Sequence, residues 1–145
     1  MGELPELLYQ DLQLEKEFPV LKYPITRKLV DRFIETTGDD NPLYSDEASC
    51  REEGLPGVLA PTGLAGIFGR LSYLQHHQMP PGGILAKQEM EFFSPFYVGD
   101  TLQVRAKVTE RYRRKERDYV TIESVAERQD GEKVAVVRVT AIWPK

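Results

Sequence analysis

The sequence has little of what marks an extracellular, metal-binding or membrane-embedded protein. Its single cysteine, Cys50, excludes an intrachain disulfide and is typical of a protein in the reducing cytoplasm, where we expect this chain to lie. No spacing of cysteine, histidine and carboxylate suggests a metal site. No apolar run approaches the roughly 18 residues of a membrane span. Because no basic region followed by an apolar one opens the chain, we expect no signal peptide.

The chain also lacks an excess of positive charge. Its formal net charge of −4 offers no global attraction for nucleic acid or an anionic membrane, and we expect neither as a partner. No glycine-rich phosphate loop is present. One local basic run, Arg111, Arg113, Arg114, Lys115 and Arg117, is either a solvated hairpin or a patch for a ligand phosphate.

The 145 residues predict one domain, residues 1–145, in which residues 1–16 form a polar N-terminal arm. Residues 18–23 are apolar between two prolines, which suits an edge strand. Thr26 can cap a helix with apolar residues on one face, and Gly38 ends it. A turn follows at 39–45, a short helix from Asp46 to about Glu53, and an apolar, glycine-containing helix at 63–74.

From residue 83 the apolar pattern alternates with period two. Four strands are predicted at 84–93, 101–111, 119–128 and 133–143. The segments 99–100, 114–118 and 129–132 are predicted turns, and Asp130-Gly131 is a strong hairpin signal. Helices followed by an antiparallel meander define an α+β protein with one buried helix.

The segment from Gly38 to Asp46, Gly-Asp-Asp-Asn-Pro-Leu-Tyr-Ser-Asp, carries the main functional signal. It resembles the Asp-x-Asn-Pro-x-His signature of the MaoC-like (R)-specific enoyl-CoA hydratases and 3-hydroxyacyl dehydratases. The blocks at 54–62 and 89–100 are similar to the N-terminal, FAS1-like type of these domains, so the resemblance covers roughly residues 17–143. It implies the hotdog fold, an antiparallel curved sheet wrapped around a central helix.

The same resemblance implies roles for individual residues. Asp39 falls on the family's catalytic aspartate and Asn41 matches directly, but Tyr44 stands where the catalytic histidine is expected. Hydration of an enoyl thioester needs a base for water and donors for the enolate oxygen. Tyrosine, with an ordinary pKa near 10, is a poor base at neutral pH. We therefore expect an impaired site, with a rate loss of roughly 10²–10⁴ for one missing acid/base group.

Other site candidates are less specific. Thr62 and Gly63 open the predicted central helix, where the family's carbonyl-binding amide lies, although this position is equally suited to a plain helix start. His76 and His77 suit a solvent-exposed helix end, and their alternative role is to substitute for the missing catalytic histidine. Cys50 suits a half-buried structural position. The alternative for Asp39, Asn41 and Tyr44 is a purely structural role. Asp39 and Asn41 would stabilise a turn through side chain–backbone hydrogen bonds, and Tyr44 would be a packed aromatic side chain.

Three hypotheses remain for the function. The first is a hydratase/dehydratase subunit that holds an acyl-CoA or acyl-carrier-protein substrate while a MaoC-like partner chain supplies Asp and His. The second is a homodimeric hotdog enzyme, a hydratase or thioesterase, that uses Asp39. The third is a non-catalytic acyl-thioester binding module. In each case coenzyme A or phosphopantetheine enters as part of the substrate, no separate cofactor is expected, and the chain forms a homodimer or heterodimer.

Overall fold

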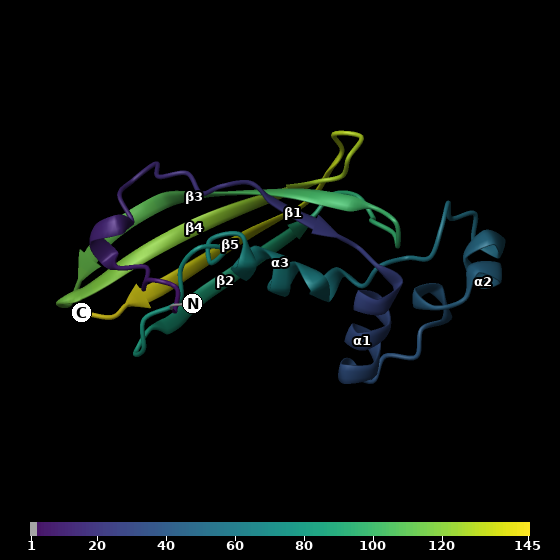
Figure 1. Ribbon diagram of the computed structural model, residues 1–145, viewed down its shortest axis with the longest axis horizontal. Helices are drawn as coiled ribbons and strands as arrows, with labels where there is room; N and C mark the ends of the chain where they lie inside the picture. The colour runs from purple at the N-terminus through teal and green to yellow at the C-terminus, as the bar shows by residue number, and fades with distance from the viewer. Residues whose placement is uncertain (1–2) are drawn as a thin grey trace.

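The computed structural model describes residues 3–145. Its main element is one antiparallel, curved sheet with strand order β1-β3-β4-β5-β2 (Figure 1). The strands are β1 (Leu21–Pro24), β2 (Ile84–Phe92), β3 (Thr101–Arg114), β4 (Arg117–Glu127) and β5 (Lys133–Trp143). Thus β1 and β2 are the two edges, and the long β3–β4–β5 meander forms the centre.

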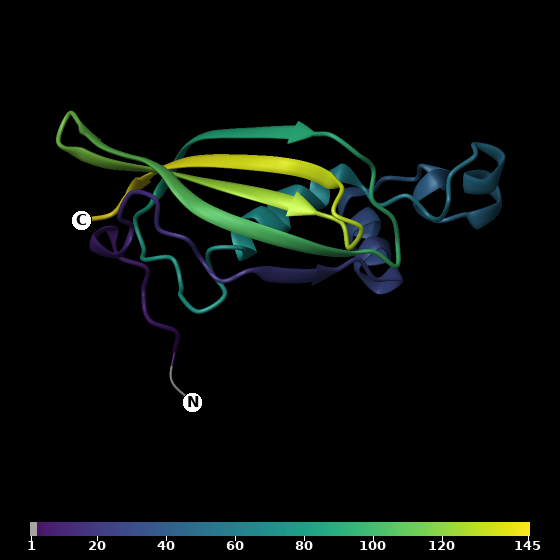
Figure 2. The ribbon, with the colours of Figure 1, turned by 90° about the horizontal axis from the view of Figure 1, so that it is seen from above.

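Three α-helices accompany the sheet. They are α1 (Arg27–Thr37), α2 (Glu47–Glu52) and α3 (Ala65–Leu71), and α3 lies against the sheet while α1 and α2 form a lobe at one end (Figures 1 and 2). The boundaries of α1 follow the predicted signals, because Thr26 Oγ1 accepts a bond from the N–H of Leu29 and Gly38 adopts φ 72°. A curved antiparallel sheet around a central helix is the hotdog fold.

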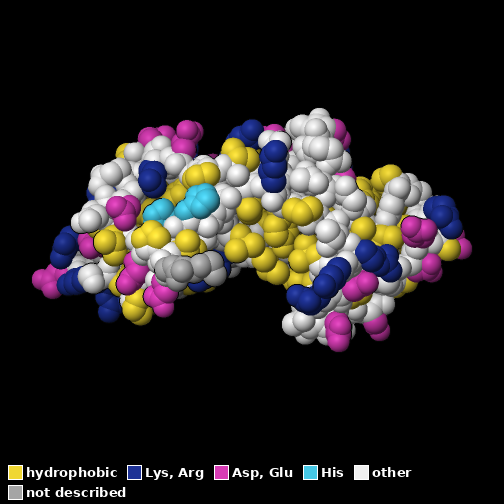
Figure 3. All heavy atoms as spheres, viewed as in Figure 1, with side chains coloured by type: hydrophobic (Ala, Val, Ile, Leu, Met, Phe, Trp, Pro, Cys, Tyr) yellow, Lys and Arg dark blue, Asp and Glu magenta, His cyan; other side chains and the backbone are white. Residues whose placement is uncertain are grey.

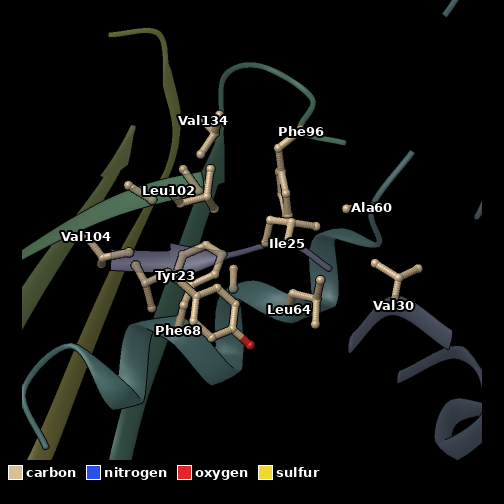
Figure 4. Close-up of a cluster of buried hydrophobic side chains, with 14 residues drawn as sticks. Tyr23, Ile25, Val30, Ala60, Leu64, Phe68, Phe96, Leu102, Val104 and Val134 are labelled. Atoms are coloured by element: carbon tan, nitrogen blue, oxygen red, sulfur yellow. The ribbon is translucent and has the colours of Figure 1, made fainter. Parts of the chain in front are cut away.

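The core fills the space between α3 and the sheet. Phe68 is fully buried, with its ring centroid 5.8 Å from that of Tyr23 on β1 and 6.2 Å from that of Phe96 (Figure 4). Gly69 lets the helix approach β5 closely, since a Cβ at this position would lie 3.1 Å from Val137 Cγ1. The buried face of α3 is therefore held by packing with strands distant in sequence.

The N-terminal arm covers a second cluster of buried residues. It contains one 3₁₀ turn, η1 (Tyr9–Asp11), and buries Leu7 and Leu12 completely. Trp143 Nε1, at the end of β5, donates a 2.7 Å hydrogen bond to the carbonyl of Leu7. The arm is thus anchored to the sheet.

Several predicted boundaries were wrong. The predicted helix at 63–74 is a 3₁₀ turn, η3 (Thr62–Leu64), followed by the seven-residue α3. The predicted turn at 114–118 is only Lys115-Glu116, both with positive φ, so β3 and β4 run further into it. The edge strand begins at Leu21 rather than at residue 18. None of the helices within residues 3–145 has the length and apolar character needed to cross a membrane.

Candidate functional site

The Asp39 turn is built by its own side chains. Asp39 Oδ1 accepts a 3.0 Å bond from the N–H of Asn41, and Asn41 Oδ1 accepts a 3.0 Å bond from the N–H of Leu43. The second bond caps the 3₁₀ turn η2 (Pro42–Tyr44). Asp39 is exposed, and only one of its oxygens is used in this way. The turn therefore presents a carboxylate to solvent while holding its backbone in one conformation.

Tyr44 has a different environment from Asp39. Its side chain is half-buried and packs against the core cluster between α3 and the sheet. The neighbouring carbonyl of Leu43 accepts bonds from the N–H of Leu59 (2.9 Å) and from Cys50 Sγ (3.1 Å). Cys50 is buried and serves this structural contact. The turn is consequently tied to both α2 and the segment that leads to α3.

Thr62 and Gly63 lie in η3, directly before α3, and both are exposed. Among residues 3–145 no acceptor is found for the N–H of Gly63, as is usual for the first amides of a helix. Phe33 of α1 packs against this backbone, since a Cβ on Gly63 would lie 2.7 Å from Phe33 Cζ. Sequence reasoning missed Phe33, because only the fold places α1 beside η3.

The structure brings some of the candidate residues together and separates others. Asp39, Asn41 and Tyr44 share one turn in the α1–α2 lobe, and Phe33 links that lobe to Gly63. The two histidines line a hollow of about 90 Å³ beside Phe18 and Tyr73, in the other half of the molecule (Figure 3, cyan). Neither histidine therefore substitutes for the missing one at the Asp39 turn.

The basic run lies at the tip of the β3–β4 hairpin, at the opposite end of the sheet from α1 and α2 (Figure 2). Two of its arginines, Arg111 and Arg113, interact with other residues of the chain. The Arg111 guanidinium lies 4.0 Å from the ring centroid of Tyr9, and Arg113 pairs with Asp118 at 3.7 Å. This placement disfavours a phosphate patch for a thioester bound at the Asp39 turn of the same chain.

A cavity of about 420 Å³ lies between α3, β2 and β5. Gly66, three residues after Gly63, lines it on the helix side. Arg70 and Gln88 are polar side chains in the same lining. In the same region, hydrophobic side chains gather on the surface over α3 (Figure 3). Within the described residues, no group of three or more His, Cys, Asp or Glu side chains could hold a metal ion.

Comparison with known proteins agrees with this architecture. The family model of the FAS1-like dehydratase domain region matches residues 14–137. A 3-hydroxybutyryl-CoA dehydratase of Methylorubrum extorquens is 29% identical over 113 residues, which are 76% of this chain and 69% of that protein. A 3-oxo-4,17-pregnadiene-20-carboxyl-CoA hydratase alpha subunit of Mycobacterium tuberculosis is 33% identical over 45 residues, 31% of this chain and 14% of that protein.

Two solved structures share the fold at lower identity. The unliganded R-hydratase PhaJ1 of Pseudomonas aeruginosa has a TM-score of 0.80 at 22% identity, covering 97% of this chain and 87% of that one. The HadBC 3R-hydroxyacyl-ACP dehydratase complex of M. tuberculosis has a TM-score of 0.77 at 20% identity, covering 89% and 96%.

The fold, together with a family-model match over residues 14–137, defines a hotdog protein of the MaoC-like hydratase/dehydratase class. Within that class, the chain belongs to the FAS1-like dehydratase family.

Proposed function

We propose that this chain is a subunit of an enoyl-thioester hydratase or 3-hydroxyacyl-thioester dehydratase, and that it holds an acyl-CoA or acyl-carrier-protein substrate. The observation that carries the proposal is the Asp39 turn, which keeps its hydrogen-bonded shape although Tyr44 replaces the expected histidine. Gly63 supplies an amide N–H to the thioester oxygen, with Thr62 beside it. The partner chain supplies an intact Asp and His.

Exposure of the site supports a role that needs a second chain. Asp39, Thr62 and Gly63 all face solvent, whereas charge stabilisation on a thioester oxygen is effective only where water is excluded. A partner that covers this surface would lower the local dielectric and complete the acid/base pair. The names of two relatives, a hydratase alpha subunit and the HadBC complex, describe proteins of several chains.

The test is hydration of crotonyl-CoA by the purified chain, alone and with a MaoC-like chain that carries Asp-x-Asn-Pro-x-His. Alone, we expect a rate lower by roughly 10²–10⁴ than that of the complex, because Tyr44 is a poor base at neutral pH. Asp39→Ala should leave the rate of the complex nearly unchanged. Robust turnover by the chain alone, abolished by Asp39→Ala, would contradict the proposal and favour a homodimeric enzyme.

We further propose that assembly joins sheets edge to edge through β2. Every residue of β2 except Met90 is exposed, and its end residues Ile84, Leu85 and Phe92 are 50%, 57% and 45% exposed. β2 is thus an unpaired edge strand with apolar ends and a charged middle, and an unpaired edge is a template for pairing with another chain. Pairing would also cover the surface over α3, which lies beside this edge.

Light scattering is expected to give a particle of about twice the 16.6 kDa chain mass. This dimer forms either from two copies of the chain or from the chain and its partner. Leu85→Lys should shift the equilibrium toward single chains, because it places a charge in the apolar end of β2. Val20→Lys, at an exposed apolar residue near the opposite edge, is the matched control and should leave the mass unchanged. A stable monomer at micromolar concentration, with and without the partner, would refute this assembly.

A further inference from the structure

The cavity between α3, β2 and β5 has a mixed lining that a plain hydrocarbon would not require. Most of its walls are apolar, formed by Tyr73, Met79, Ile84, Leu85, Val139, Ala141 and Trp143. Arg70 and Gln88 enter this lining from opposite sides, from α3 and from β2. No hydrogen bond or ion pair joins either side chain to another residue among those described. Both therefore have donors free for a ligand.

The position of Arg70 relative to Tyr73 places its charge at the cavity. Burial raises the pKa of the Tyr73 hydroxyl, and the positive charge of Arg70 opposes that rise. Tyr73 is itself part of the cavity wall and only 7% exposed. The exposed guanidinium of Arg70 is therefore near enough for its charge to act on a residue of the cavity wall.

The face of α3 leads from the thioester site to this arginine. Gly66 and Arg70 are four residues apart on α3, so they lie on one side of the helix, and Gly63 lies in the 3₁₀ turn η3 directly before it. Seven residues at about 1.5 Å each separate Gly63 from Arg70 by about 10 Å along the axis. Gly66 itself lines the cavity, and Met90 Cε packs beside it, 3.6 Å from where a Cβ would stand. A chain that begins at Gly63 and follows α3 would enter the cavity at Gly66 and end near Arg70.

The two ends of this path differ in chemistry. An alkyl chain alone would suit the apolar walls but would offer no acceptor to Arg70, which is exposed and would keep its bonds to water. A carboxylate would accept two parallel bonds from the planar guanidinium. Gln88 can donate an additional bond through its amide.

We propose that the acyl group bound by this chain carries a carboxylate at its distal end, and that Arg70, assisted by Gln88, determines this specificity. The inference rests on the proposed function, because it takes Gly63 as the thioester end of the site. It adds a substrate class, the thioesters of dicarboxylic acids, and a residue that selects it.

Calorimetric titration of the assembled, full-length protein with saturated CoA thioesters tests the inference without turnover. The ligands are length-matched pairs with and without a terminal carboxylate: succinyl and butyryl, adipoyl and hexanoyl, suberoyl and octanoyl. In at least one pair the carboxylate form should bind at least tenfold tighter. Arg70→Gln should abolish that preference while changing the Kd of the alkyl partner less than threefold. Arg70→Lys keeps the positive charge but not the planar guanidinium, and it should retain part of the preference for the carboxylate form.

Arg117→Gln is the control, because it removes an equal charge at the hairpin tip, far from the cavity. It should leave the preference intact. Equal or tighter binding of the alkyl member in every pair would overturn the inference and leave the proposed function standing. An Arg70→Gln variant that weakens all thioesters and free coenzyme A equally would show that Arg70 holds the carrier portion, and would also overturn it. If no acyl thioester binds, the proposed function itself fails.

Discussion

Replacing Tyr44 by histidine is expected to raise hydration of a trans-2-enoyl-CoA by at least tenfold over the unmodified chain. The bonds that shape the turn join Asp39, Asn41 and Leu43 and do not use the Tyr44 side chain, so the substitution keeps the backbone of the turn. An imidazole with a pKa near neutrality would then stand in the same turn as Asp39. Tenfold is about 1.4 kcal/mol of transition-state stabilisation, and general acid/base catalysis allows considerably more.

Two controls separate restored catalysis from a change in packing. Tyr44→Phe removes the hydroxyl but keeps the ring against the core cluster, and it should alter the rate little. Adding Asp39→Ala to the histidine variant should remove the gain. The gained rate should rise with pH through about 6.5, because only neutral imidazole is a base. A folded histidine variant that binds acyl-CoA yet gains no activity would show that the site has lost more than one imidazole.

Phe68→Ala is expected to lower the free energy of unfolding by about 3–5 kcal/mol, the largest effect on stability that we predict. Phe68 is fully buried on α3 and contacts the rings of Tyr23 and Phe96, so its removal leaves a cavity between helix and sheet. The seven-residue α3 has little stability of its own and depends on this packing. Denaturant unfolding monitored by circular dichroism measures the change.

Leu14→Ala provides the comparison for this loss, because Leu14 is 57% exposed and lies outside the helices and strands. Its free energy of unfolding should change by less than about 0.5 kcal/mol, as is usual at exposed positions. A Phe68→Ala loss of similar size to that of Leu14→Ala would mean that α3 is not the central packing element of the fold.

Most of the local structure could be predicted from residue types and their period. The strand from residue 133 to 143 was predicted with its observed bounds, because alternating apolar residues and the Asp130-Gly131 turn mark it locally. The cap of α1 at Thr26 and its end at Gly38 were predicted for the same reason. The turn at Asp39 was also predictable, since aspartate, asparagine and proline determine its bonds within five residues.

Features that depend on contacts between distant residues could not be predicted in this way. The contact between Phe33 and Gly63 and the short extent of α3 follow from how α1 and the sheet pack around the helix. The placement of the basic run at the far end of the sheet from Asp39 follows from strand order. The cavity lined by both Arg70 and Gln88 also follows from the tertiary arrangement. Periodicity reports which side of an element is apolar, whereas the partner of that side is determined by the free energy of packing the whole chain.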